Sequence, residues 1–140
     1  MVDAGEAYLC AVGKPGWRAG LLYERACLLE TLGQLEEAVA SAEEAVALEL
    51  RNPGAPGYTL ATYRWALGDL LRQLGRTQVA EHQYRDVLAD SDSDPYGRKC
   101  AHEGLAWCAL DRGASGAARR EADAAVRLAE GMGDNLRAAR

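Results

Sequence analysis

Apolar residues recur at intervals of three and four along most of the chain, a spacing that places them on one side of an α-helix. The pattern predicts pairs of amphipathic helices joined by short turns that contain glycine, over residues of about 18–52, 58–92 and 95–130. Residues 1–17 have the pattern of a partial repeat, with its helix over 3–13. A turn is predicted at 131–134, and residues 134–140 have the pattern of the start of a further helix. The chain is therefore expected to be a single all-α domain of helical hairpins.

Small residues hold fixed positions in the three helix pairs. In each pair, one small residue lies seven positions before the turn glycine, and a second lies twelve positions after the first. The turn glycines are Gly33, Gly75 and Gly113, preceded by Ala26, Gly68 and Ala106 and followed by Ala38, Ala80 and Ala118. Glycine ends a helix readily because it adopts a left-handed conformation without a side-chain penalty. The small residues allow the two helices of a hairpin to approach closely, and Tyr63, Leu71 and Tyr84 are predicted to lie in the core.

This pattern resembles the tetratricopeptide repeat, whose signature is a Trp/Leu-Gly-Tyr run followed by alanine, an aromatic residue, alanine and proline. The second pair has the signature residues in the right order and spacing, namely Leu67, Gly68, Leu71, Ala80 and Tyr84. The first and third pairs are degenerate versions. The resemblance extends from about Arg18 to Glu130. It implies antiparallel hairpins stacked in a right-handed superhelix, an α-solenoid.

The turn glycines lie 42 and then 38 residues apart, more than the family's usual repeat of about 34 residues. The extra residues are assigned to 52–57, which is rich in proline and glycine, and to 90–95. In the second segment, Ser93 or Asp94 can cap a helix whose first turn holds Pro95. Such segments are expected to protrude as surface loops, or the helices to be longer. The chain starts and stops within a repeat, which fits either an excerpt from a longer array or a short protein with frayed ends.

Composition supports helices and narrows the function classes. Alanine and leucine, the best helix formers, dominate the apolar residues, and phenylalanine is absent. The net charge is −5, from 21 acidic and 16 basic residues, which disfavours a nucleic-acid partner. No apolar run approaches the roughly 20 residues of a membrane span, so no membrane partner is expected. The first residues lack the pattern of a signal peptide, and a cytoplasmic location follows as the default.

The sequence offers little for catalysis or metal binding. The cysteines are Cys10, Cys27, Cys100 and Cys108, and they form no CxxC motif, so they are expected to be small apolar residues of helices. His82 and His102 lie on different helix pairs, and the spacing from Cys100 to Cys108 is too long for a helical metal pair. The serines have no GxSxG context. The chain is therefore expected to be a non-enzyme without cofactor or metal.

The family resemblance implies that the first helix of each hairpin lines the concave face. The candidate binding residues on this face are Tyr23, Cys27, Glu30, Trp65, Asp69, Arg72, Glu103, Trp107 and Asp111. Aromatic residues are common binding hot spots, which suggests a groove for the apolar anchors of an extended or helical peptide. The acidic residues favour basic neighbours in that peptide. In the alternative interpretation, Trp65 and Trp107 pack between the repeats as core.

Some tetratricopeptide domains clamp a C-terminal carboxylate with Lys, Asn and Arg. The matching positions here hold Tyr23, Cys27, Ala66, Asp69, Cys100 and Gly104, a set that cannot donate hydrogen bonds as that clamp requires.

The family resemblance leaves two functional hypotheses. The first is the binding of another protein or peptide, whose identity the sequence does not give, within a larger bacterial regulator. The second is self-association as a homodimer through exposed terminal helices.

Overall fold

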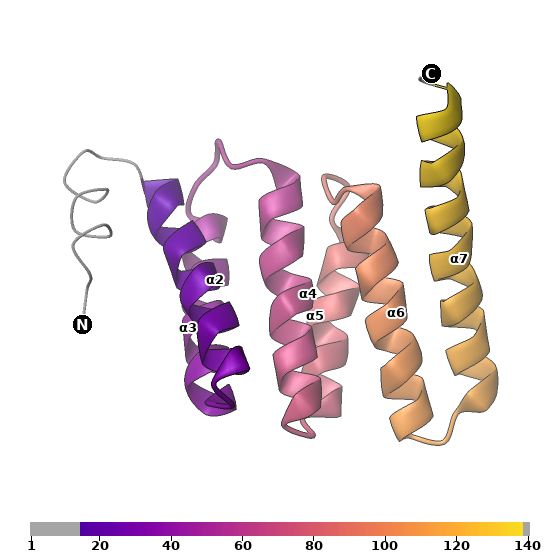
Figure 1. Ribbon diagram of the computed structural model, residues 1–140, viewed down its shortest axis with the longest axis horizontal. Coiled ribbons are helices and arrows are strands. Elements are labelled where there is room, and N and C mark those ends of the chain that lie inside the picture. The colour runs from indigo at the N-terminus through magenta and orange to yellow at the C-terminus, as the bar shows by residue number, and fades with distance from the viewer. Residues whose placement is uncertain (1–14, 139–140) are drawn as a thin grey trace.

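The computed structural model describes residues 15–138, with side chains described from 16 to 133. The helices of this part are α2 (Pro15–Thr31), α3 (Leu35–Leu50), α4 (Gly57–Gln73), α5 (Thr77–Ala89), α6 (Pro95–Asp111) and α7 (Ser115–Ala138). They pair as the hairpins α2–α3, α4–α5 and α6–α7, and no strand lies in the described residues. In Figure 1, α2, α4 and α6 line the near side of the stack, α3 and α5 lie behind, and α7 closes one end. The predicted all-α hairpin fold is confirmed, while the helix predicted over 3–13 lies outside the described residues.

Each hairpin turns at the glycine that the sequence pattern indicates. Gly33, Gly75 and Gly113 have φ angles of 78°, 77° and 74°, in the left-handed region. At the first turn, the backbone N–H of Gly33 donates to Glu30 O at 2.9 Å, and that of Gln34 donates to Leu29 O at 2.9 Å. The other two turns repeat both bonds. These bonds satisfy carbonyl groups that the end of a helix otherwise leaves without a donor.

The segment 90–95 is bound into the stack, although the sequence suggested that it would protrude. Asp94 caps α6 and accepts from the backbone N–H of Gly97 at 3.2 Å. Ser93 is buried, and its hydroxyl donates to Val87 O at 2.6 Å. Of the two predicted caps, Asp94 is thus the cap, and Ser93 ties the segment to the last turn of α5. The segment 52–57 is more exposed. Part of the extra length of the repeats lies instead in the helices, since α2, α3, α4 and α6 have 16 or 17 residues each.

Among the residues whose side chains are described, Tyr84 is the largest fully buried one, and it joins the second and third hairpins. A Cβ atom built on Gly68 of α4 would lie 2.7 Å from its ring, and one built on Gly104 of α6 would lie 2.2 Å from it. Both distances are far below van der Waals contact, so the ring occupies space that two glycines leave open. The small residues Ala38, Ala80 and Ala118 are buried as predicted. At Gly68, however, the small size makes room for a ring of the partner helix rather than for its backbone.

The hydroxyl of Tyr84 donates to Asp69 Oδ1 at 2.5 Å. Burial raises the pKa of the Asp69 carboxyl, while this hydrogen bond and the nearby Arg72 oppose the rise. Tyr63 and Leu71, the other residues predicted to lie in the core, are also buried. The buried Tyr84 thus links the core, through its hydroxyl, to the half-buried Asp69 carboxylate of α4.

The predicted turn at 131–134 is wrong, because α7 continues as one helix from Ser115 to Ala138. Among the described glycines, only the three hairpin glycines have a positive φ. No proline follows the glycines at 131 and 133, and the good helix formers around them carry the helix through at a cost of about 1 kcal/mol per glycine. Within the described residues, no helix combines the length and the apolar character needed to cross a bilayer.

We expect Gly104→Ala to destabilise the fold by about 1–3 kcal/mol, because the new methyl group collides with the Tyr84 ring. The control is Gly131→Ala, whose Cβ would meet nothing within 4 Å. This change removes a helical glycine and should stabilise by about 0.5–1 kcal/mol. Urea unfolding measures both free energies. A neutral Gly104→Ala would contradict the packing of Tyr84, and a destabilising Gly131→Ala would contradict the continuous α7.

Asp69→Asn should stabilise the chain at neutral pH and have less effect at acidic pH. Burial raises the pKa of Asp69 in the folded state above its value in the unfolded state. The free energy of unfolding therefore decreases as the pH rises through the range between these two pKa values. Asparagine keeps an acceptor for Tyr84 but cannot ionise. The measurement is the difference in unfolding free energy between the two proteins from acidic to neutral pH. A difference that grows toward acid would show that the pKa of Asp69 is instead lowered.

Candidate functional site

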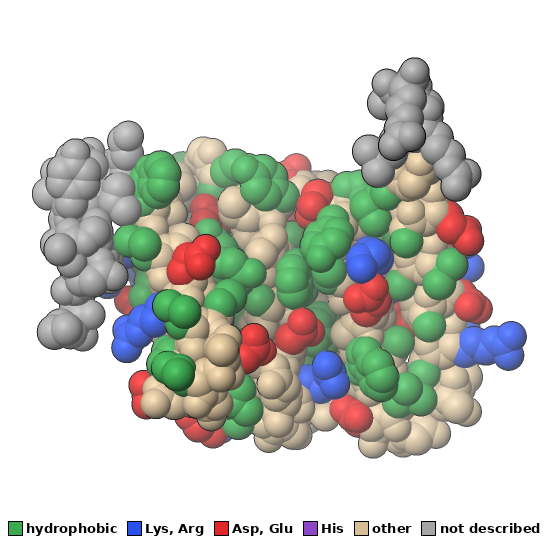
Figure 2. All heavy atoms as spheres, viewed as in Figure 1, with side chains coloured by type: hydrophobic (Ala, Val, Ile, Leu, Met, Phe, Trp, Pro, Cys, Tyr) green, Lys and Arg blue, Asp and Glu red, His purple; other side chains and the backbone are tan. Residues whose placement is uncertain are grey.

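Two hollows adjoin on the side of the stack formed by α2, α4 and α6. The first, of about 170 Å³, is lined by Tyr23, Ala26, Cys27, Glu30, Trp65, Ala66, Asp69 and Leu70. The second, of about 210 Å³, is lined by Trp65, Asp69, Arg72, Tyr96, Lys99, Cys100, Glu103, Gly104 and Trp107. Because they share Trp65 and Asp69 of α4, we treat them as one surface, the inner groove. Figure 2 shows this side, where hydrophobic side chains alternate with charges of both signs.

Helical spacing explains why the predicted residues meet. In α2, Tyr23, Cys27 and Glu30 are four and three positions apart, so they lie on one face. The corresponding positions of α4 and α6 lie on the same side because the hairpins repeat. All the predicted binding residues except Asp111 line the inner groove.

Asp111 is exposed and lines neither hollow. Glu30 and Arg72 lie three positions before their turn glycines, whereas Asp111 lies two positions before Gly113. One position rotates a side chain by about 100° around the helix. The equivalent residue of the third hairpin is therefore Leu110, and the assignment of Asp111 to this face is corrected.

The two tryptophans occupy different environments. Trp107 is 54% exposed, and the Arg72 guanidinium lies over its ring at 5.6 Å from the centroid. Trp65 is half-buried, packs against the core, and makes an edge contact with Tyr96 at a centroid distance of 6.3 Å. Trp107 is thus a surface residue, whereas Trp65 lines the groove and also packs against the core.

Polar groups of the groove are partly satisfied within the protein. Gln73 Nε2 donates to Glu30 Oε2 at 2.6 Å, and Lys99 Nζ donates to Glu103 Oε1 at 2.7 Å. Within the described residues, the buried Trp65 Nε1 and Arg72 Nε have no hydrogen-bond acceptor. Buried donors of this kind normally have one. The groove wall therefore contains two N–H groups with unused hydrogen-bonding capacity.

The thiols of the groove are poorly suited to nucleophilic chemistry. Cys27 and Cys100 are free, as is Cys108 in the core. Burial raises the pKa of both groove thiols, so they are protonated at neutral pH, and the thiolate is the reactive form.

His102 Nδ1 lies 2.6 Å from Glu121 Oε2 of α7, in a contact between the two helices of the third hairpin.

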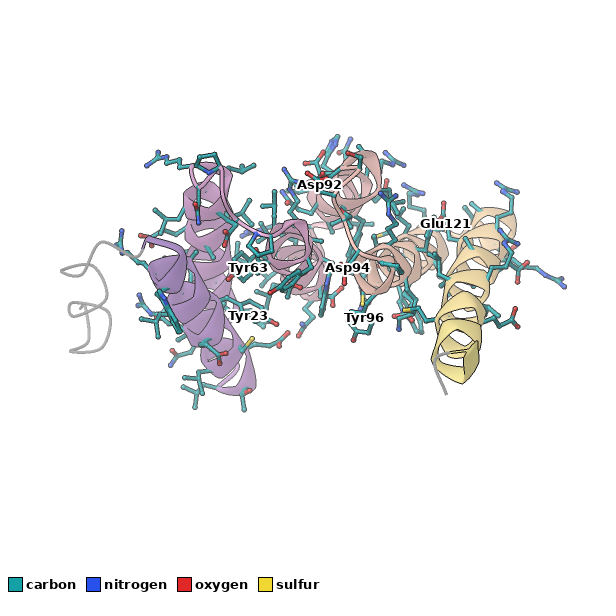
Figure 3. All side chains as sticks on the ribbon, turned by 90° about the horizontal axis from the view of Figure 1, so that it is seen from above. Tyr23, Tyr63, Asp92, Asp94, Tyr96 and Glu121 are labelled. Carbon is teal, nitrogen blue, oxygen red and sulfur yellow. The ribbon has the colours of Figure 1, made fainter. Side chains whose placement is uncertain are left out.

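Tyr96 and Lys99 belong to the groove but were absent from the predicted set. Figure 3 shows Tyr96 on α6, and the Lys99 ammonium lies 5.1 Å from the centroid of its ring. A signal for both exists in the sequence, because they lie seven and four positions before Glu103, on the same helical face. Extending the face toward the start of α6 would have found them.

A second apolar surface lies at the α7 end of the stack. This end hollow, of about 580 Å³, is lined by Lys99, Glu103, Ala106, Trp107, Leu110, Ser115, Ala118, Arg119, Ala122, Ala125, Val126 and Ala129. Its large apolar residues Trp107, Leu110 and Val126 are 54%, 51% and 53% exposed. Trp107 also lines the inner groove, so one ring borders both surfaces.

Comparisons with known families agree with the repeat architecture. Residues 17–93 match a family model described as tetratricopeptide repeat, and residues 65–135 match a second model of the same description. No curated protein matches the chain. Tetratricopeptide repeats generally mediate protein–protein interactions and are typically non-enzymatic scaffolds. Because each model covers more than half of the chain, and the hairpins carry the expected turns and packing, the chain belongs to the tetratricopeptide repeat family.

Proposed function

We propose that the inner groove binds an extended segment of a partner protein, with apolar side chains of that segment against its aromatic rings. The observation that carries this proposal is the continuity of the groove across three hairpins. Tyr23, Trp65 and Trp107 lie on its successive helices and line its two hollows. Residues of this type dominate the binding energy of protein interfaces.

The dimensions of the groove suit an extended segment. Packed helices lie roughly 8–10 Å apart, and an extended chain advances about 3.3 Å per residue. For the packed pair α4 and α6, one hairpin therefore corresponds to about three residues of the partner, so anchors against Trp65 and Trp107 should lie about three positions apart. An extended backbone also carries a carbonyl at each residue, which can accept from Trp65 Nε1 or Arg72 Nε once the side chains around these atoms shift.

Charge favours basic residues next to the anchors. Glu30, Asp69 and Glu103 line the groove. Of the two basic side chains there, Lys99 is already paired with Glu103 and Arg72 lies over Trp107. Because Lys99 and Glu103 neutralise each other, Glu30 and Asp69 outnumber Arg72. A partner with lysine or arginine between apolar residues therefore meets a surface with one excess negative charge, in a protein whose net charge is −5.

Trp107→Ala should weaken partner binding by about 2 kcal/mol or more, as expected for an aromatic hot spot, and should leave the fold intact because the ring is exposed. The ligands are peptides selected from a random library on the wild-type chain, with affinity measured by calorimetry. Since Trp107 also borders the end hollow, Glu30→Lys supplies a variant specific to the groove, and it should weaken binding of the same basic peptides by about tenfold, or 1.4 kcal/mol.

Val126→Ala is the matched control, since Val126 lines only the end hollow. Selected peptides that bind both groove variants as tightly as the wild type would refute binding in the inner groove. Loss of helical circular dichroism in Trp107→Ala would instead place Trp107 in the core.

The end hollow supports a second candidate function, self-association of two copies of the chain. Trp107, Leu110 and Val126 are large apolar residues left in contact with water. Covering such surface contributes about 25 cal/mol per Å². The exposed part of α7 carries both basic and acidic side chains, among them Arg127 and Glu130, so two copies of α7 can pair without net repulsion.

For this candidate, Val126→Glu should convert a dimer into a monomer, because a carboxylate in the apolar contact cannot be hydrated there. Light scattering over a range of concentrations measures the mass. Arg127→Ala, on an exposed position of the same helix outside the hollow, is the control and should remain dimeric. A wild-type chain that is monomeric at all concentrations would exclude this candidate.

A further inference from the structure

A third hollow lies at one edge of the stack, separate from the inner groove. This edge hollow, of about 500 Å³, lies between the start of α2, the end of α3 and the start of α4. Its lining includes Trp17, Glu49, Asn52, Tyr58 and Tyr63 and shares no residue with the inner groove. Tyr63 of α4 and Tyr23 of α2 lie between the two sites (Figure 3), with ring centroids 5.2 Å apart.

Glu49 is the feature that distinguishes this hollow. It is only 5% exposed, and no residue in the described part of the chain forms a hydrogen bond or ion pair with its carboxylate. The other strongly buried acid, Glu81, is paired with Arg85 and Arg112, and the half-buried Asp69 accepts from Tyr84. Burial of a charge without a partner is costly. The carboxylate oxygens of Glu49 are not among the fully enclosed atoms that lack a partner, so they reach the hollow, where no described group compensates their charge.

The surroundings of Glu49 suit a positive charge. Trp17 and Tyr58, which are 58% and 56% exposed, belong to the lining of the hollow. The negative face of an aromatic ring attracts ammonium and guanidinium groups within about 6 Å of its centroid. Glu49 also lies in the last turn of α3, where the helix dipole places partial negative charge. Carboxylate, aromatic faces and helix terminus thus act in the same direction.

We propose that the edge hollow binds an organic cation with an alkylammonium or guanidinium group, with Glu49 as its counter-ion and Trp17 and Tyr58 against its apolar part. A divalent metal is a poorer fit, because such ions need several oxygen ligands. The described residues contain no group of three or more histidine, cysteine, aspartate or glutamate side chains that could supply them. An anion is excluded by the charge of Glu49.

The ionisation properties of the site agree with this assignment. Burial raises the pKa of Glu49. Burial, followed by the charge of Glu49, raises the pKa of Tyr63 to about 12. A cation beside the carboxylate would favour its ionised form and lower the pKa of Glu49. Burial in the hollow thus disfavours the charged form of Glu49, which a cation would stabilise.

The test is a titration of the full chain with butylammonium and with butylguanidinium at constant ionic strength, followed by NMR at the Trp17 indole and the Gly20 amide. We expect saturable shifts with a dissociation constant of roughly millimolar, typical of a single small group. Glu49→Gln should weaken binding at least about tenfold, the effect of 1.4 kcal/mol. Glu43→Gln, at an exposed position of the same helix, should bind as the wild type does.

N-butylurea, a neutral analogue of butylguanidinium, is the control for simple apolar binding. Equal affinity for this analogue, undiminished binding by Glu49→Gln, or no saturation in the wild type would each overturn the proposal. Misfolding cannot imitate the expected result, because Glu49→Gln removes an uncompensated charge and should melt no lower than the wild type by circular dichroism.

The source of the cation can be distinguished with the same titration. If lysine or arginine blocked at both ends binds more tightly than the bare cation, the ligand is a peptide side chain. Equal affinities indicate a free amine or guanidine, and both results support the site. Because the edge hollow shares no residue with the inner groove, groove variants such as Glu30→Lys should leave this titration unchanged even if the groove binds no peptide.

Discussion

The phenol ring of Tyr84 fills a space that exists only because α4 and α6 each carry a glycine opposite it. A methyl group at Gly68 or Gly104 would occupy the position of the ring, so the distance between the second and third hairpins depends on these three residues together. Its hydroxyl then holds Asp69, a residue common to both hollows of the inner groove. Packing between hairpins and the position of a groove carboxylate are thus set by a single side chain.

Much of the fold could be predicted because helical repeats are governed by local rules. The spacing of apolar residues indicated the hairpins, and the need for a left-handed residue located their turns at Gly33, Gly75 and Gly113. The groove followed from the same regularity, since equivalent positions of successive hairpins share one side of the stack. Asp111 is one residue out of register and lines neither hollow of the groove, while Leu110, the residue in register, lines the end hollow. To predict which side chains line the groove, the position of a residue relative to its turn glycine is therefore more informative than its type.

Other features depend on contacts that no local pattern encodes. Glycine favours a turn only where the backbone adopts a positive φ, and near residue 131 the neighbouring helix formers outweigh its preference, so α7 continues. The sequence does not indicate that Ser93 is buried, or that its hydroxyl donates a hydrogen bond to Val87 O. The edge hollow is the clearest case, because Trp17, Glu49 and Tyr58 belong to three different helices and meet only after the first two hairpins have stacked.

Trp107 lines both the inner groove and the end hollow, as do Lys99 and Glu103. A molecule that moves the ring when it binds on one side would alter the free energy of binding on the other, and by thermodynamic reciprocity the effect would be equal in both directions. A further helix or a second subunit that covers the last hairpin and moves this ring would therefore modulate affinity in the groove without touching the bound segment. In such an array, the neighbour at the end of the stack would act as an effector as well as a cap.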